Sequence, residues 1–297
     1  MRELTILRAG PLTSIQDDGR FGILRHGISA SGPMDRAAYA LAGALAGSGK
    51  GGIEFTTGIE IRQSAGQSRV GFAGGQFTVR HNGNPVEWPG AVALEAGDTL
   101  AVTPGKSGNY GYLRFDGDVL ARPVMGSIST SSRAGLGGLD GRVLRAGDRF
   151  ALSPASGMGY KPPRQDAPSD GLVRVVWGLH ADLFSPTTRQ RFLDGSFIIS
   201  RRLDRMGVRL EDSQGVFADS AILSLVSDAI VPGDIQILGD GTPIVLMRDH
   251  QPTGGYPRIA TVISADLDRF AQMRPGAPVA FASVTVEHAH QLLRSRK

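Results

Sequence analysis

Two neighbouring stretches near the N-terminus concentrate side chains that could bind a ligand. Residues 13–20 (TSIQDDGR) combine an amide, carboxylates and a guanidinium, and residues 25–35 (RHGISASGPMD) add an imidazole, hydroxyls and a further carboxylate. An alanine-rich segment with helical spacing follows, and the unpaired N–H groups of a helix N-terminus favour anions and polarised carbonyls. We therefore predict substrate binding here. The candidates are Gln16, Asp17, Arg20, His26, Ser29, Ser31 and Asp35.

A purely structural role for the same side chains is the alternative. Ser31 and Asp35 would then cap the helix that follows, because short polar side chains accept hydrogen bonds from its first N–H groups. Asp17 would pair with Arg20. The sequence pattern leaves both interpretations open.

The C-terminal half carries a matching cluster in residues 200–207 (SRRLDRMG) and 248–257 (RDHQPTGGYP). A Thr-Gly-Gly turn lets backbone N–H groups approach a ligand, because glycine accepts positive φ. We predict a second site, or the opposite wall of one shared pocket, with Arg205 in a partly exposed ion pair. The alternative is a tight turn with a buried tyrosine. The candidates are Arg202, Arg205, Asp249, Gln251, Thr253, Gly254, Gly255 and Tyr256.

Familiar catalytic and metal-binding patterns are incomplete in this chain. The stretch 47–50 (GSGK) resembles a phosphate-binding loop, but Ala44 occupies its first glycine position and Gly51 the position of its hydroxyl. We expect a turn there. The chain has no cysteine, which excludes disulfides, thiolate metal sites and a cysteine nucleophile. We predict no metal site, and the pattern identifies no catalytic base or nucleophile.

Composition narrows the class of protein. Of the 297 residues 41% are hydrophobic and 20% charged, which is typical of a folded globular protein and excludes general disorder. The net charge of +4 comes from scattered arginines rather than a basic block, so we expect no nucleic-acid partner. No apolar run approaches the ~18 residues of a membrane span. We therefore expect a cytoplasmic protein with no membrane association.

The elements that must position these clusters are mostly short strands. The 41 glycines and 17 prolines interrupt the chain too often for long helices. A helix is predicted near 33–46, and shorter ones at 186–193 and 266–272. Residues 161–170 are polar and proline-rich, which predicts a linker between an N-terminal domain, 1–160, and a C-terminal domain, 171–297. The alternative is a long loop inside one domain.

Five long segments of the chain are distinctive. They are TSIQDDGRFG (13–22), HGISASGPMDRAAYALA (26–42), GSISTSSRAGLGGLDGRVLRAGD (126–148), RRLDRMGVRLE (201–211) and VPGDIQILGDGTPIVLMRDHQPTGGYPRIATVISADL (231–267). In this order, and over nearly the whole chain, they resemble the carboxyltransferase/allophanate hydrolase subunit 2 family. This family includes the C subunit of 5-oxoprolinase, the KipA-like proteins and the carboxyltransferase region of urea carboxylase.

The resemblance implies an all-β fold with few short helices, arranged as two tandem cyclophilin-like β-barrel domains. It also implies a heteromeric, ATP-dependent 5-oxoprolinase that opens the lactam ring of 5-oxoproline to glutamate. The implied partners are a KipI-like B subunit and a LamB/YcsF-type A subunit. We expect the chain to be inactive alone, with ATP bound in the complex, either here or on a partner.

Two other functions are compatible with the same resemblance. One is a biotin-dependent carboxyltransferase component that acts on urea or a related amide. No lysine of this chain has a neighbouring methionine, so biotin would then have to be carried by another protein. The other is a KipA-like regulatory binding protein, which performs no chemistry.

Overall fold

The computed structural model describes residues 1–47, 49–155, 171–218 and 225–295. The chain divides into two compact units. Unit 1 comprises Met1–Ile23 and Ala30–Pro163, and unit 2 comprises Leu24–Ser29 and Arg164–Lys297. Strands account for 38% of the residues and helices for 16%, which confirms the predicted all-β class with few short helices. The predicted linker at 161–170 lies outside the described residues.

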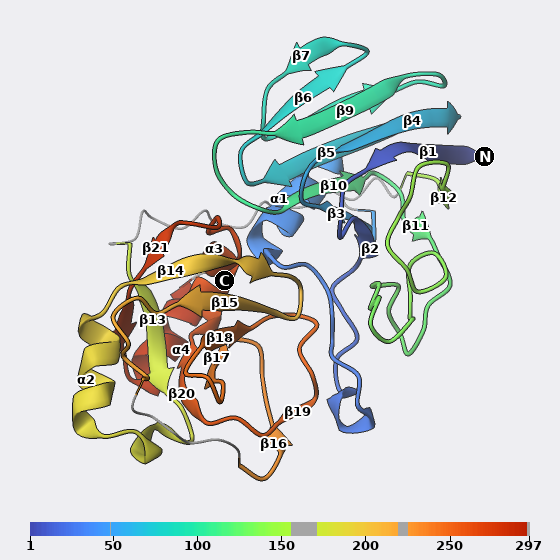
Figure 1. The fold of residues 1–297 in the computed structure, drawn as a ribbon. Helices are drawn as coiled ribbons and strands as arrows, with labels where there is room; N and C mark the ends of the chain where they lie inside the picture. Colours follow the sequence, from blue (N-terminus) through green and yellow to red (C-terminus); the bar gives the residue numbers. More distant parts are fainter. Residues whose placement is uncertain (48, 156–170, 219–224, 296–297) are drawn as a thin grey trace. The chain divides into compact units, whose positions relative to one another are not determined.

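Unit 1 consists of twelve strands and one α-helix within its described residues (Figure 1). They are β1 (Arg2–Ala9), β2 (Ser14–Gln16), α1 (Arg36–Ala46), β3 (Gly52–Phe55), β4 (Ile59–Ala65), β5 (Ser68–Gly74), β6 (Phe77–His81), β7 (Asn84–Val86), β8 (Gly90–Leu94), β9 (Thr99–Pro104), β10 (Gly111–Phe115), β11 (Val119–Leu120) and β12 (Arg149–Leu152). The strands form a seven-stranded sheet in the order β11-β12-β1-β4-β9-β6-β7 and a five-stranded sheet in the order β2-β3-β10-β5-β8.

One hydrophobic core joins the two sheets of unit 1. In β4, Ile59 and Ile61 are buried while Glu60 and Arg62 are not, which is the period-two pattern of a strand with one face inward. These isoleucines belong to the same buried cluster as Phe72 of β5 in the other sheet. Burial of large apolar side chains from both sheets therefore holds unit 1 together.

Helix α1 packs on the five-stranded sheet, and Figure 1 shows it beside β5 and β10. The helix begins after Asp35, whose carboxylate accepts a hydrogen bond from the Ala38 N–H at 2.9 Å. It ends before Gly47, whose φ of 114° is in the left-handed region that glycine adopts without strain. Gly71 of β5 allows the close approach, since a Cβ there would lie 2.2 Å from the Ala42 carbonyl oxygen.

Unit 2 is built on an eight-stranded sheet in the order β21-β14-β15-β18-β17-β20-β13-β22, with a separate ribbon of β16 and β19. Its pairings are antiparallel except for the parallel pair of β13 and β22. Its elements are η1 (Leu24–His26), β13 (Val173–Trp177), η2 (Ala181–Leu183), α2 (Pro186–Asp194), β14 (Phe197–Leu203), β15 (Gly207–Glu211), β16 (Asp228–Ala229), β17 (Asp234–Ile237), β18 (Pro243–Leu246), β19 (Thr253–Gly254), β20 (Arg258–Val262), α3 (Ser264–Ala271), β21 (Pro278–Val279), β22 (Phe281–Ser283) and α4 (Val286–Ser295).

The helices of unit 2 agree with the sequence prediction except at the C-terminus. Helix α2 begins after Ser185, whose hydroxyl accepts from the Thr188 N–H at 3.0 Å, and Phe192 of this helix stacks on Phe281 of β22. Helix α4 has no buried residue and was not predicted. Within the described residues, no helix combines the length and apolar composition needed to cross a membrane.

Candidate functional site

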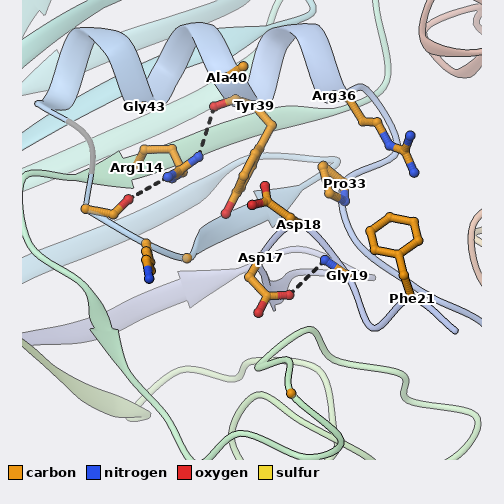
Figure 2. Close-up of a pocket in the computed structure, with 14 residues that line it drawn as sticks. Asp17, Asp18, Gly19, Phe21, Pro33, Arg36, Tyr39, Ala40, Gly43 and Arg114 are labelled. Carbon is orange, nitrogen blue, oxygen red and sulfur yellow. Dashed lines mark hydrogen bonds between the residues drawn. The ribbon is translucent and has the colours of Figure 1, made fainter. Parts of the chain in front are cut away.

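A cavity of about 740 Å³ opens in unit 1 beside the N-terminal half of α1 (Figure 2). Its walls come from the β2–α1 connection, the helix itself, the turn before β3 and β10. The lining residues are Asp17, Asp18, Gly19, Phe21, Pro33, Arg36, Tyr39, Ala40, Gly43, Gly49, Lys50, Gly51, Arg114 and Gly126.

Gln16 does not line the cavity; it connects the segments beneath it by hydrogen bonds. Its side chain is fully buried and donates to the Ser14 hydroxyl at 2.9 Å and to the Thr130 carbonyl at 3.2 Å. Its amide oxygen accepts from the Gly32 N–H at 3.1 Å, and its own carbonyl accepts from the Tyr39 hydroxyl at 2.9 Å. A buried amide with all these partners acts as a brace between segments.

Asp17 is held as a carboxylate by neutral donors. Its oxygens accept from the hydroxyls of Ser127 and Ser129 and from the N–H groups of Ile128, at 2.8 Å, and Gly19, at 3.0 Å. Burial raises the pKa of this carboxyl, but the four hydrogen bonds outweigh burial and lower it below its ordinary value. Asp17 therefore stays ionised at the edge of the cavity.

Arg20 and Ser31 form another buried support. Arg20 is only 2% exposed, and its guanidinium donates to the carbonyls of Val124 and Ser129 and to the Ser31 hydroxyl. Ser31 has a positive φ of 56° and is also buried. Arg20 and Ser31 are thus structural residues, but their contacts are not the ones that the structural alternative named: the Ser31 hydroxyl accepts from Arg20, and Asp35 caps α1. The alternative is confirmed for Asp35.

A buried tyrosine pair positions the start of α1. The Tyr112 hydroxyl donates to Glu54 at 2.9 Å and accepts from the Asp35 N–H at 2.7 Å, while Glu54 also accepts from the Met34 N–H at 2.8 Å. The rings of Tyr39 and Tyr112 meet edge to face at 5.7 Å. Burial raises the pKa of both phenols, and the neighbouring carboxylates raise it further, so both stay protonated.

Arg114 of β10 lies flat against the wall of the cavity. Its guanidinium stacks over the Tyr39 ring at 4.0 Å and donates to the carbonyls of Tyr39 and Gly49, as Figure 2 shows. Gly43 leaves room for it, since a Cβ there would lie 3.1 Å from a guanidinium nitrogen. Its Nε is buried without a hydrogen-bond partner among the described residues.

The groups free to meet a ligand are neighbours of the predicted residues. Asp18 and Lys50 are exposed, and neither side chain has a hydrogen bond or ion pair within the described part of the chain. Arg36 is also exposed, and its guanidinium lies over the Phe21 ring, 5.6 Å from the ring centroid. Two carboxylates, Asp17 and Asp18, thus share the cavity with three cationic side chains. Such a cavity can bind a small molecule with a carboxylate and an amide, and can stabilise negative charge on a carbonyl oxygen.

Only Asp17 of the N-terminal candidates lines this cavity. His26 and Ser29 belong to the segment Leu24–Ser29, which groups with unit 2. His26 is exposed and its Nε2 accepts from the Arg25 Nε at 3.1 Å. The sequence interpretation missed five residues of the cavity wall: Asp18, Arg36, Tyr39, Lys50 and Arg114. The GSGK stretch at 47–50 was the available signal for Lys50.

The expected exposure of Arg205 is wrong. Arg205 is 6% exposed and its guanidinium meets Asp249 at 2.8 Å and 3.3 Å, with Asp249 itself buried. The Asp249 N–H also donates to the Arg205 carbonyl at 2.7 Å. The pair joins the turn after β14 to the loop after β18. The expectation failed because two distant segments enclose both side chains.

The remaining C-terminal candidates are more accessible. Gln251 and Thr253 are exposed, and Tyr256 is 39% exposed, so the alternative of a buried tyrosine is wrong. Gly254 is in β19, and a Cβ there would lie 2.5 Å from the Gln236 amide nitrogen. The Gly255 carbonyl accepts from the Leu225 N–H at 2.7 Å, so this part of the turn has a structural contact. Arg202 lines a separate cavity within unit 2.

Comparison with known proteins identifies the family. The family model "carboxyltransferase domain, subdomain A and B" matches residues 26–283. The chain belongs to this carboxyltransferase domain family. It is 33% identical to the 5-oxoprolinase C subunit of Escherichia coli strain K12, over 96% of this chain and 93% of that protein. It is 31% identical to the 5-oxoprolinase C subunit of Haemophilus influenzae, over 99% and 95%.

A solved structure shares the fold of this chain. The crystal structure of the Kluyveromyces lactis urea amidolyase superposes with a TM-score of 0.89 over 99% of this chain at 24% identity. The chain spans only 19% of the length of that protein. At this identity the match establishes the fold of the carboxyltransferase domain and nothing further.

Proposed function

We propose that the chain is the C-type component of an ATP-dependent 5-oxoprolinase, which opens the lactam ring of 5-oxoproline to glutamate. The observation that carries this proposal is the alignment with two 5-oxoprolinase C subunits, at 33% and 31% identity. Each alignment covers more than nine-tenths of this chain and more than nine-tenths of the relative. The urea amidolyase match, by contrast, covers 19% of a much longer chain.

The unit 1 cavity suits a lactam that carries a carboxylate. Lys50 or Arg36 can form an ion pair with the substrate carboxylate, and Asp18 can accept a hydrogen bond from the lactam N–H. The positive charge of the Arg114 guanidinium in the cavity wall can stabilise the lactam oxygen, where negative charge develops when water adds to the carbonyl carbon. The C–N bond then breaks and the nitrogen takes up a proton, giving glutamate.

ATP and the partner proteins belong to the same proposal. The described residues form no complete phosphate loop around Lys50, because Ala44 at its first glycine position is inside α1 and Gly51 replaces the hydroxyl. The residues present do not fit ATP in that way, so we place ATP on a partner. The partners are a KipI-like B subunit and a LamB/YcsF-type A subunit, and the chain alone is inactive.

A biotin-dependent carboxyltransferase component is the second candidate. The shared fold with a urea amidolyase and the name of the family support it. Urea and 5-oxoproline both present a planar amide, so one oxyanion-stabilising cavity serves either substrate. A separate biotin carrier would be required. A KipA-like regulatory binding protein remains the third candidate and predicts no turnover.

Co-expression with both proposed partners tests the proposal. The tagged chain should co-purify with the KipI-like partner, and the complex should release glutamate from 5-oxoproline only with ATP. Carboxylation of urea in the presence of a biotin carboxylase and a biotinylated carrier, without glutamate release, would support the second candidate instead. Robust turnover by the isolated chain would overturn the requirement for partners.

Two variants test the cavity within that complex. Lys50→Ala and Asp18→Asn should each lower glutamate release roughly ten- to hundredfold, since a charge-assisted hydrogen bond is worth about 1.5–3 kcal/mol. Lys106→Ala is the matched control, because Lys106 is an exposed lysine that does not line the cavity. If Lys50→Ala and Asp18→Asn released glutamate as fast as Lys106→Ala, the cavity would not be the substrate site.

A further inference from the structure

A groove in unit 2 lies at the edge of the eight-stranded sheet, where β13 extends beyond its neighbour β22. Its volume is about 440 Å³, which is within the range of about 300–1,000 Å³ that binding sites occupy. Four of its six lining residues are apolar. The lining residues are Val176 and Trp177 from the end of β13, and Ser283, Val284, Thr285 and Val286 from the segment that joins β22 to α4.

The parallel ladder of β13 and β22 ends beside this groove. Its last register pair joins Val175 to Ser283, and the Val284 N–H still donates to the Val175 carbonyl at 2.8 Å. The chain then turns into α4, which begins at Val286. Trp177, two residues further along β13, therefore has no neighbouring strand on this side, and the groove occupies the place that a longer β22 would fill.

The main-chain groups of Trp177 point toward this side of β13. On the opposite side β13 pairs with β20, where the Gly178 N–H donates to the Ile259 carbonyl at 2.9 Å and the Arg174 carbonyl accepts from the Ile263 N–H at 3.0 Å. Successive residues of a strand direct these groups to alternate sides. Within the described residues, neither the N–H nor the carbonyl of Trp177 has a hydrogen-bond partner.

Exposed apolar side chains and one negative charge border these main-chain groups. Trp177 is 39% exposed, Leu179 80% and Val286 51%, although all three are large and apolar. Glu287 follows Val286, is exposed and forms no salt bridge with the described residues. The groove thus offers a main-chain donor, a main-chain acceptor, apolar contacts and a carboxylate at its α4 end.

We propose that this edge binds an extended segment of another protein that carries apolar side chains and one basic side chain. The segment adds a strand beside β13, because an unpaired strand edge matches an extended main chain. Its apolar side chains contact Trp177 and Val286, and its basic side chain faces Glu287. A second copy of this chain suits the edge less well, because a two-fold contact would bring two Glu287 carboxylates to the same interface.

Nuclear magnetic resonance of the isotope-labelled full chain tests whether the edge is unpaired. In the free chain the Trp177 amide proton should exchange with solvent roughly tenfold faster, or more, than that of Gly178, which is hydrogen-bonded to Ile259. The probe is an acetylated and amidated hexapeptide that alternates valine with threonine and has lysine in place of its last threonine. Its addition should shift the Trp177 amide resonance and slow this exchange. Slow exchange without peptide, or no binding at about 1 mM peptide, would overturn the proposal.

Matched peptides test the strand pairing and the charge. Only alternate residues of an added strand direct their N–H groups toward Trp177. Of two peptides, one N-methylated at the valines and one at the threonines, only one should therefore lose affinity, by roughly tenfold. Equal affinity of the two would overturn strand pairing. Replacing the lysine by glutamate should weaken binding, and unchanged or tighter binding would overturn the contact with Glu287.

A variant of the groove tests the location. Val286→Ser should weaken binding of the probe severalfold, because it removes an apolar wall. Val231→Ser is the matched control, since Val231 is a similarly exposed valine of unit 2, at 46%, that does not line the groove. Equal affinity of the two variants would overturn the assignment. A dimer of the free chain in sedimentation that Val286→Ser dissociates would make a second copy the occupant and also overturn it. The inference concerns unit 2 alone and does not depend on the activity proposed above.

Discussion

The N-terminal cluster around Asp17 and the C-terminal cluster around Arg205 stabilise their charged residues in different ways. In unit 1, Asp17 is satisfied by hydroxyls and backbone N–H groups, and Arg20 donates to backbone carbonyls. In unit 2, Arg205 pairs with Asp249, and Arg174 pairs with Asp266. A charge that is hydrogen-bonded only by neutral groups is not compensated by an opposite charge. The Asp17 carboxylate therefore contributes a negative potential at the unit 1 cavity. Charges held in pairs cancel, and such pairs serve to join segments.

Breaking a charge pair in unit 2 should have the largest effect on stability. Arg205→Ala leaves the Asp249 carboxylate buried without its guanidinium, which costs about 3–5 kcal/mol. We expect the melting temperature of unit 2 to fall by on the order of 10 °C. Arg201→Ala, an exposed control on β14, should change stability by less than about 0.5 kcal/mol. A small shift for Arg205→Ala would show that water reaches Asp249.

Removing one neutral hydroxyl from unit 1 should cost less. Tyr112→Phe removes the two hydrogen bonds of the buried hydroxyl, one from the Asp35 N–H and one to Glu54, which costs about 1–3 kcal/mol. Tyr256→Phe is the control, because Tyr256 is 39% exposed. Chemical denaturation of both variants measures the difference. Equal free energies of unfolding would mean that the Tyr112 network contributes nothing.

The pH dependence of Asp17 should be smaller still. Its pKa is lowered in the folded chain, so its contribution is present above the unfolded pKa and is lost as pH falls through the folded value. In Asp17→Asn the amide presents N–H donors toward the Ile128 N–H, which should cost about 1 kcal/mol at pH 7 at this half-buried site. Denaturation from pH 7 to pH 2.5 should show the wild type and variant converging below about pH 4. A constant difference would contradict the assigned ionisation.

Lys50→Ala should have the smallest effect on stability. The side chain is exposed and has no partner within the described residues, so the free energy of unfolding should stay within about 0.5 kcal/mol of wild type. The same variant is expected to lose activity in the complex. A large loss of stability would instead make Lys50 a structural residue, comparable to Arg205.

The elements of the fold could largely be predicted from local patterns. The helix start at Asp35 and its end at Gly47 follow from capping chemistry and from the φ that glycine allows. The strands of unit 1 follow from alternating burial and frequent turns. Helix α4 was not predicted, although its apolar and polar residues alternate with helical spacing.

The candidate site was predictable in its location but less so in its residues. The sequence indicated the β2–α1 connection, which does border the unit 1 cavity. It did not separate buried supports such as Gln16 and Arg20 from exposed groups such as Asp18. The sequence shows which chemical groups are present but not which of them are buried. Because both kinds of residue are polar, it could not separate them.

The sequence by itself determined the family, the turn-rich β class and the ends of α1, because each depends on neighbouring residues. Tertiary structure alone decided which charges are buried. Asp17 meets Ser129 and Arg205 meets Asp249 across 112 and 44 positions of the chain. Such contacts form only when the sheets are assembled, and the assembled contacts determine whether a charged side chain supports the fold or stays free for a ligand.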